Sequence, residues 1–156
     1  MRKSRAKKRE IVPDPRFNDV LVAKFINNMM LQGKKETARK IFYEAIDVVD
    51  QRIEEESGIE TWKKALNNVM PSVMVKSRRV GGATFQIPME VKPDLKISFG
   101  IKWMIGYSRK RNEKSMAQKL AGEIIAASKG EGAAVKKKED THKMADANKA
   151  FSHFRV

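Results

Sequence analysis

The chain of 156 residues contains no cysteine and only two histidines, His142 and His153. Without thiols it has no disulfide, no thiolate zinc site, no thiol nucleophile and no iron–sulfur cluster. Two histidines alone also disfavour a multi-histidine metal centre. No run of 18 or more apolar residues is present, so the sequence predicts no membrane span and no membrane partner. These absences favour a cytoplasmic, non-catalytic protein without a cofactor or a metal.

What the sequence has in excess is positive charge. It carries 33 Lys and Arg against 19 Asp and Glu, a formal net charge of +14. Residues 44–60 hold seven acidic side chains and one basic side chain, so this stretch carries −6 and the remainder carries +20. So large an excess indicates a polyanionic partner, with nucleic acid the leading candidate ahead of an anionic membrane surface. The asymmetry favours a protein that lies with one face on the polyanion and the acidic face in solvent.

Hydrophobic periodicity predicts a mainly α fold. Apolar residues recur at helical spacing over about 19–32, 36–55, 59–70, 94–109, 115–130 and 136–153. Asn18 or Asp19, Asp94 and Ser115 are the candidate N-caps of the first, fourth and fifth of these helices. We therefore expect a six-helix bundle-like domain over 13–156, preceded by a basic N-terminal arm over 1–12 that is flexible when free.

The period changes between the third and fourth predicted helices. Residues 72–79 and 83–91 have a β-type pattern around Val80-Gly81-Gly82, and two glycines in succession suit the positive φ angles of a tight hairpin turn. The sequence thus predicts one protruding β-hairpin arm at about 72–91. A projecting arm adds little to a core, so alanine at Arg78 and Arg79 is expected to leave the fold intact.

Lysine and arginine gather in five clusters that are candidate phosphate contacts. The hairpin cluster is the sharpest, because three cations crowd before a bare turn where the backbone can approach a nucleic-acid strand. The cluster at 136–138 is expected to begin the last helix, where the macrodipole disfavours cations. The clusters are the arm (Arg2, Lys3, Arg5, Lys7, Lys8, Arg9), the first loop (Lys34, Lys35), the hairpin (Lys76, Arg78, Arg79), the helix junction (Arg109, Lys110, Arg111, Lys114) and the last helix (Lys136, Lys137, Lys138).

Aromatic and histidine side chains near these cations are weaker candidates. Phe85 and Tyr107 lie close to the hairpin and junction clusters, so they are the candidates for stacking on a base. The two histidines are eleven residues apart on the last predicted helix, about 16 Å along its axis, which is too far for them to share one metal. A surface or RNA-facing position is favoured for both over catalysis.

Four segments resemble the bacterial-type small-subunit ribosomal protein seven family, and the similarity runs from about Lys8 to Arg155. They are KREIVPDPRFNDVLVAKFINNMM, VKSRRVGGATFQIPMEVKP, YSRKRNEKSMAQKLAGEIIAA and AVKKKEDTHKMADANKAFSHFR. The resemblance implies a structural, ribosome-bound protein that binds the 3′ major domain of small-subunit rRNA directly and nucleates assembly of the subunit head. It also implies a place beside exit-site tRNA and mRNA, contacts with the ninth and eleventh small-subunit proteins, and no homo-oligomer.

The resemblance also assigns residues. All the cations of the arm, the first loop, the hairpin and the helix junction match rRNA-binding positions of the family. The residues it implies to be near tRNA and mRNA are Arg78, Arg79, Val80, Gly81, Gly82, Lys136, Lys137, Lys138, His142 and Lys143.

The fourth predicted helix departs from the family. Residues 95–100 replace a stretch that is usually richer in Arg and Ala, so no rRNA contact is assigned to the start of that helix. Gly100 and Gly106 are expected to weaken it by up to ~1 kcal/mol each relative to alanine.

Two other functions fit the residues taken alone. An architectural DNA-binding protein could use the same basic hairpin as a β-ribbon arm. A metal-dependent nuclease could use Asp47, Asp50 and Glu54, which recur at helical spacing in the acidic stretch, although the charge around them would repel a nucleic acid.

Overall fold

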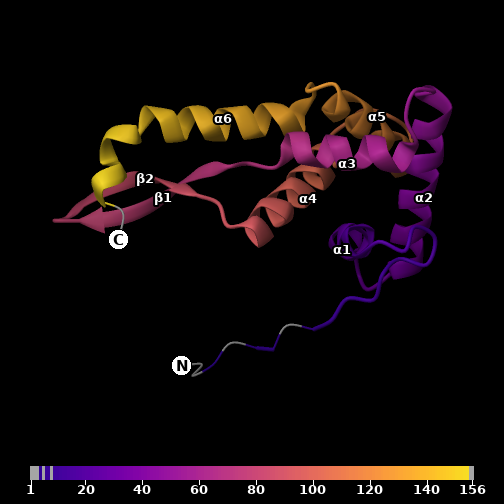
Figure 1. Cartoon of the computed structure of the whole chain (residues 1–156), viewed down its shortest axis with the longest axis horizontal. Coiled ribbons are helices and arrows are strands. Elements are labelled where there is room, and N and C mark those ends of the chain that lie inside the picture. Colours follow the sequence, from indigo (N-terminus) through magenta and orange to yellow (C-terminus); the bar gives the residue numbers. More distant parts are fainter. Residues whose placement is uncertain (1–3, 5, 8, 155–156) are drawn as a thin grey trace. The chain divides into compact units, whose positions relative to one another are not determined.

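The computed structural model describes residues 4, 6, 7 and 9–154 and confirms the predicted fold class (Figure 1). Within these residues, six α-helices and a 3-10 helix accompany one two-stranded antiparallel sheet, whose hairpin lies between the third and fourth helices. The elements are α1 (Val20–Met29), α2 (Lys35–Arg52), α3 (Gly58–Val69), β1 (Val73–Val80), β2 (Ala83–Glu90), α4 (Pro93–Arg109), α5 (Met116–Ser128), α6 (Ala133–Ala147) and the 3-10 helix η1 (Lys149–Phe154).

The chain divides into two compact units, Met1–Lys40 and Ile41–Val156, and each is described by itself. The predicted division into an arm over 1–12 and one domain over 13–156 stays a prediction. In the part of the chain that the structure describes, no helix is both long and apolar enough to cross a membrane.

In the first unit, two aspartates organise the entry to α1. The buried Asp14 carboxylate accepts the backbone N–H groups of Arg16 at 3.1 Å and Phe17 at 3.3 Å, which closes a turn. Asp19 is the N-cap, and its side chain accepts the N–H of Leu21 at 2.7 Å. Because a capping carboxylate satisfies an N–H that the first helical turn leaves unpaired, α1 begins at this point. One of the two predicted caps for this helix is therefore confirmed.

In the second unit, serine caps start two helices. Ser57 accepts the N–H of Glu60 before α3, and Ser115 accepts the N–H of Gln118 before α5, as its sequence position predicted. The prediction that Asp94 caps α4 is wrong. Lys92 occupies the N-cap without a side-chain hydrogen bond, and Pro93 takes the first helical position, where a missing N–H costs nothing.

The core of the second unit lies where α3 packs against α4 and α5. Trp62 of α3 is fully buried and meets Phe42 of α2 edge to face, with ring centroids 5.3 Å apart. Gly100 allows α4 to approach α3 closely, because a Cβ atom there would lie 2.8 Å from Cγ of Met70 and 3.1 Å from Cδ1 of Leu66. Gly100 is therefore a packing requirement as well as a weak helix former.

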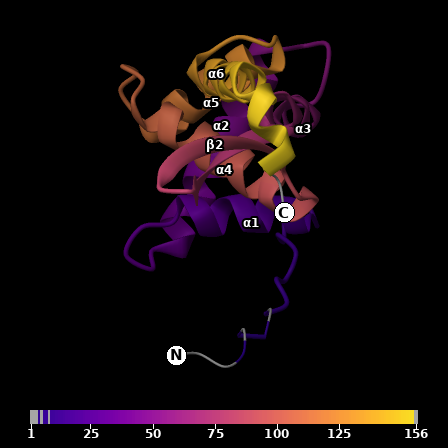
Figure 2. The same ribbon diagram turned by 90° about the vertical axis from the view of Figure 1, so that its left-hand side faces the viewer.

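The hairpin packs against neighbouring helices on part of its surface, while residues 76–79 and 81–84 near its tip are exposed. Its register pairs Val73 with Glu90 at the base and Val80 with Ala83 at the tip. Helix α6 lies against β1 and η1 lies against β2, as the two views show (Figures 1 and 2). Only Ile87 of the hairpin is buried, so the arm adds little to the core, although it does pack against α6 and η1. The expected tolerance of alanine at Arg78 and Arg79 stays a prediction.

The last predicted helix is two helices. α6 begins at Ala133, three residues before the predicted start, and ends at Ala147, after which the 3-10 turns of η1 follow. The cations at 136–138 therefore lie inside α6, and the argument from their place at the helix N-terminus does not hold. His142 and His153 stand on different helices, so the single shared face expected for them is also wrong.

Candidate nucleic-acid interface

Strand geometry divides the hairpin cations between its two faces. Side chains alternate along a strand, and residues directly opposite across an antiparallel pair share a face. Arg78 pairs with Phe85, and Arg79 pairs with Thr84, so these two arginines point to opposite faces of the ribbon. All three hairpin cations, Lys76 included, are exposed. The three cations that are close together in the sequence therefore lie on two faces with different surroundings.

The face of Phe85 is covered by the C-terminal helix η1. The ring of Phe85 lies 5.2 Å from the ring of Phe151 and 5.2 Å from that of Phe154, stacked on the latter. On the same face Arg78 donates through Nη1 to the backbone carbonyl of Phe154 at 2.9 Å. Phe85, a candidate for base stacking, is therefore half-buried against the chain's own aromatic rings.

The opposite face is polar. It carries Arg79 and Thr84, followed by Ser77 and Gln86, which are opposite each other and joined by a hydrogen bond of 2.9 Å from Nε2 of Gln86 to Oγ of Ser77. All four side chains are exposed. Arg79 on this face is the hairpin cation best placed to reach a phosphate.

The hairpin turn has the backbone geometry that glycine allows. Gly81 and Gly82 have φ angles of +57° and +89°, the left-handed region in which a Cβ atom is strained. A Cβ atom on either would have no neighbour within 4 Å, so it is the backbone conformation that requires glycine here. The tip therefore presents bare backbone, which a nucleic-acid strand could approach.

Two side chains of α6 join it to neighbouring elements, one to the base of the hairpin and one to the end of α3. Nε2 of His142 accepts the backbone N–H of Ser72 at 3.1 Å, so the neutral ring carries its proton on Nδ1. Burial first, and then the charge of Lys138, lower the pKa of His142. Lys138 itself donates to the carbonyl of Asn68 at 2.8 Å. These two residues hold α6 in place, while Lys136 and Lys143 are exposed and Lys137 is half-buried.

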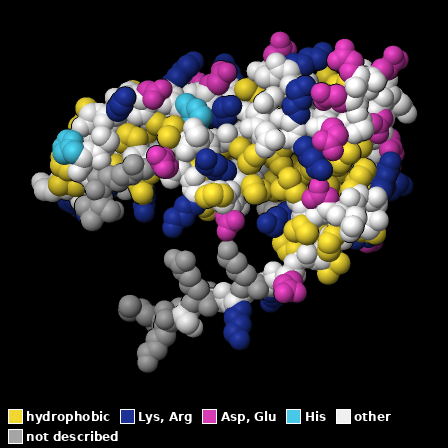
Figure 3. Space-filling model, viewed as in Figure 1, with side chains coloured by type: hydrophobic (Ala, Val, Ile, Leu, Met, Phe, Trp, Pro, Cys, Tyr) yellow, Lys and Arg dark blue, Asp and Glu magenta, His cyan; other side chains and the backbone are white. Residues whose placement is uncertain are grey.

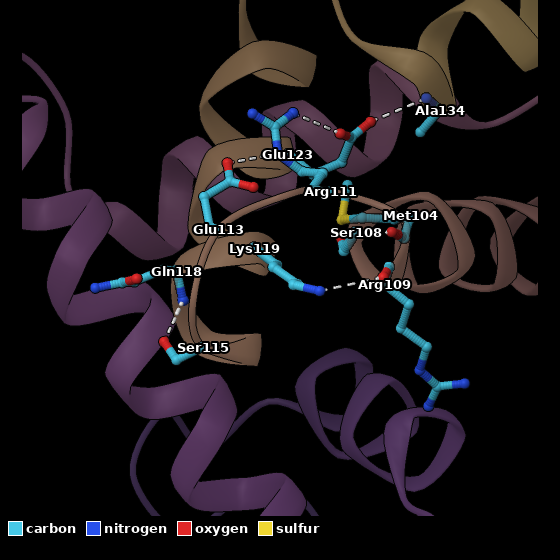
Figure 4. Close-up of polar contacts among 10 residues, drawn as sticks. All are labelled: Met104, Ser108, Arg109, Arg111, Glu113, Ser115, Gln118, Lys119, Glu123 and Ala134. Atoms are coloured by element: carbon cyan, nitrogen blue, oxygen red, sulfur yellow. Dashed lines mark hydrogen bonds and ion pairs between the residues drawn. The ribbon is translucent and has the colours of Figure 1, made fainter.

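The four cations at the junction between α4 and α5 also differ in their surroundings. Arg109, Lys110 and Lys114 are exposed. Arg111 instead turns inward, where Nε donates to Oε1 of Glu113 at 2.8 Å and Nη1 donates to Oε2 of Glu123 at 3.0 Å (Figure 4). Burial alone would lower the pKa of Arg111, but its hydrogen bonds to the two carboxylates outweigh that effect and raise it.

The second candidate for base stacking, Tyr107, lies beside this junction. It is half-buried, and the ammonium of Lys110 lies 5.2 Å from the centre of its ring. This is a cation–π contact within the chain. Tyr107 is therefore less exposed than the cations beside it, and its ring already contacts one of them.

Glu123 was missed by the sequence reasoning. Its side chain is fully buried in α5, yet its Oε1 accepts the backbone N–H of Ala134 at 2.9 Å in the first turn of α6. A signal was present, because this acid lies on the apolar stripe of α5 with Leu120, Ile124 and Ala127. A carboxylate on such a stripe must be paired if it is buried.

The acidic stretch covers the end of α2 and the start of α3. Its Asp and Glu side chains gather over the junction of α2 and α3 (Figure 3). Asp50, assigned to the hypothetical nuclease site, accepts the N–H of Gly58 and so joins the two helices. Within residues 4, 6, 7 and 9–154, no three His, Asp or Glu side chains come together as a possible metal site. The observed role of Asp50 is structural.

The first unit carries the remaining candidates. Lys34 and Lys35 are exposed, between the end of α1 and the first turn of α2, and Lys7 and Arg9 are exposed before α1. The other candidates of the arm lie outside the described residues: Arg2, Lys3, Arg5 and Lys8.

Taken together, the fold and its charges define a class: a basic, mainly helical protein with exposed cations on a β-ribbon, a helix junction and a helix. Comparison with known proteins narrows the class to one family, described as ribosomal protein S7p/S5e, whose pattern matches residues 1–149. The chain belongs to this family, which is structural and non-enzymatic. The resemblance seen in the sequence is confirmed, and the nuclease hypothesis is dropped.

Curated relatives match over nearly the whole chain. Small ribosomal subunit protein uS7 of Flavobacterium psychrophilum is 67% identical over 157 residues, covering 99% of each chain. The protein of the same name from Cytophaga hutchinsonii is 63% identical, again over 99% of each chain. That of Marinobacter nauticus is 58% identical over 96% of each chain.

Proposed function

We propose that this structural ribosomal protein is a component of the small ribosomal subunit and binds the 3′ major domain of its rRNA as a primary binding protein. Membership of the family supports the ribosomal role. The observation that carries the RNA contact is the set of exposed cations on the free hairpin face, at the α4–α5 junction and on α6. Exposed cations that meet phosphates displace mainly water and counterions, which favours binding.

The finer elements of the proposal concern place and partners. The protein nucleates assembly of the subunit head in the cytoplasm, and it contacts the ninth and eleventh small-subunit proteins. Its hairpin tip at residues 78–82 and the exposed part of residues 136–143 lie near exit-site tRNA and mRNA. The bare Gly81-Gly82 backbone and the exposed Lys136 and Lys143 support this, since both suit the close approach of an RNA strand.

Binding to a transcript of the 3′ major domain tests the proposal. A protein that neutralises six or more phosphates loses about 10³-fold or more in affinity between 50 and 200 mM salt. We expect such a fall for the full chain and a preference for the transcript over duplex DNA of equal length. A flat salt dependence would contradict the electrostatic mechanism, and a preference for duplex DNA would favour the architectural alternative instead.

A matched pair of variants locates the contact. Changing Lys76 and Arg79 to alanine removes two hairpin charges and leaves the contact of Arg78 with η1 intact. Changing Lys63 and Lys64 removes two charges from α3, where ion pairs join Lys63 to Glu60 and Lys64 to Glu56. Each phosphate contact contributes about threefold to the fall in affinity over this salt range. The hairpin pair should therefore shrink the fall by up to about tenfold, and the α3 pair should not. Equal effects would mean that net charge alone governs binding.

A further inference from the structure

The feature that the proposed function does not use is the buried carboxylate of Glu123. Its two oxygens face different elements: Oε2 accepts from Arg111 in the α4–α5 loop at 3.0 Å, and Oε1 accepts from the N–H of Ala134 in α6 at 2.9 Å (Figure 4). The N-cap of α6 is Gly132, which has no side chain to satisfy the first N–H groups of the helix. Glu123 therefore serves as the cap of α6 from another helix, with its charge at the favourable end of the helix dipole.

Two glycines make room for this arrangement. A Cβ atom on Gly122 would lie 2.6 Å from Oε1 of Glu113 and 3.0 Å from Nε of Arg111, so the ion pair lies directly over the backbone of α5. A Cβ atom on Gly132 would lie 3.1 Å from Oε1 of Glu123. The guanidinium and both carboxylates thus occupy positions that only glycine neighbours leave open.

The cations next to Arg111 in the sequence take no part in the ion pairs with Glu113 and Glu123. The side chain of Arg111 is 32% exposed, and its Nε and Nη1 are both engaged with carboxylates. Arg109 and Lys110 before it and Lys114 after it are exposed. The carbonyl of Arg109 is also within 3.5 Å of Nζ of Lys119, which ties the end of α4 to α5. Because the loop is held at Arg111, its other cations have a defined position.

We propose that Glu123 is a positioning residue for the rRNA contact of the α4–α5 junction, and that Arg111 acts as its partner in the protein rather than as a phosphate ligand. This inference rests on the proposed function. The carboxylate fixes Arg111, and through it the loop that presents Arg109, Lys110 and Lys114 to phosphates. The same carboxylate sets the start of α6, so one buried charge aligns two elements that face the RNA.

The test asks whether binding depends on the charge of Arg111 alone or on its hydrogen bonds to the two carboxylates. Arg111→Lys keeps the positive charge but loses the planar fork that reaches two carboxylates at once. Glu123→Gln keeps the size of the side chain, and its amide oxygen can still accept from Ala134, but its NH₂ group faces a donor. Glu113→Gln is the matched control, because it removes the other carboxylate partner of Arg111 and leaves the Glu123 contact. All variants are measured in the full chain with the 3′ major domain transcript, at a temperature where circular dichroism shows each to be folded.

The readout is the salt dependence of binding, in which each lost phosphate contact shrinks the fall in affinity between 50 and 200 mM salt by about threefold. Replacing Arg109, Lys110 and Lys114 together by alanine should shrink it by up to about thirtyfold. We expect Arg111→Lys and Glu123→Gln each to reproduce part of this loss, Glu113→Gln to have a smaller effect, and Glu123→Gln to add nothing to the triple variant.

The inference is overturned if Arg111→Lys binds like the wild type while Arg111→Ala loses one contact, because Arg111 would then be a phosphate ligand. It is also overturned if folded Glu123→Gln keeps the wild-type salt dependence, since the carboxylate would then be purely structural. If Glu123→Gln does not fold, the two Arg111 variants decide. A flat salt dependence of the wild type would contradict the proposed function itself, and is therefore a separate outcome.

Discussion

Two glycines of α4 should respond in opposite ways to the same substitution. Alanine is more favourable than glycine in a helix interior by about 1 kcal/mol. At Gly106 a Cβ atom would meet nothing within 4 Å, so Gly106→Ala should gain this full amount. At Gly100 the Cβ atom would lie 2.8 Å from Met70 and 3.1 Å from Leu66, and overpacking of this kind costs about 1–3 kcal/mol. Gly100→Ala should therefore range from neutral to about 2 kcal/mol destabilising.

Urea unfolding followed by circular dichroism measures both free energies. For a chain of this size 1 kcal/mol corresponds to roughly 2–4 °C in Tm, so Gly106→Ala should melt that much higher than the wild type and Gly100→Ala at or below it. The two variants share the same helix, the same atoms added and the same change in the unfolded chain, so their difference isolates packing. Equal stabilisation by both would refute the reasoning that α4 needs Gly100 in order to approach α3.

Three further predictions follow from single contacts. Arg78→Ala should lower the free energy of unfolding by about 1 kcal/mol, because Arg78 donates to η1, whereas Arg79→Ala on the other face should not; equal urea midpoints would contradict this. Because the pKa of His142 is lowered, its contribution to stability is present above its ordinary pKa of 6.5 and is lost as the pH falls through the lowered value. Wild-type stability should therefore drop on acidification more than that of His142→Gln, and parallel urea-midpoint profiles would show that the titration of His142 does not cause the drop. Ser115→Ala removes the cap of α5 and should cost about 1 kcal/mol, and an unchanged Tm would show that the cap is dispensable.

The packing of the hairpin against α6 and η1 gives its two neighbouring arginines different roles. An arm covered by α6 and η1 starts from a defined direction, so it loses less conformational freedom on meeting RNA than a free ribbon would. Arg78 contributes to that direction through η1, and Arg79 remains available on the polar face. The two arginines are adjacent in the sequence, but because they lie on opposite faces of the ribbon only Arg78 contacts η1.

Much of the local structure could be predicted from the sequence because it depends on neighbours. Within the described residues, the helical spacing of apolar residues located five helices to within three residues at each end, and their alternation located both strands. Gly81-Gly82 predicted a turn with positive φ, and Ser115 predicted a cap. The errors lie at helix ends, where Pro93 displaced Asp94 from the cap position and α6 gave way to η1 after Ala147. A periodic pattern alone does not distinguish one long helix from two short ones.

The sequence by itself determined the class of the protein, its elements and the separation of a −6 stretch from a +20 remainder, because each depends on composition or on residues a few positions apart. Only the tertiary structure decided which of the candidate cations are held by the contacts described above. Arg78 meets a carbonyl 76 residues away, His142 meets an N–H 70 residues away, and Arg111 is turned inward by a carboxylate on the next helix. A charge is available to a phosphate only if no partner of its own chain holds it. That depends on which segments the fold brings together.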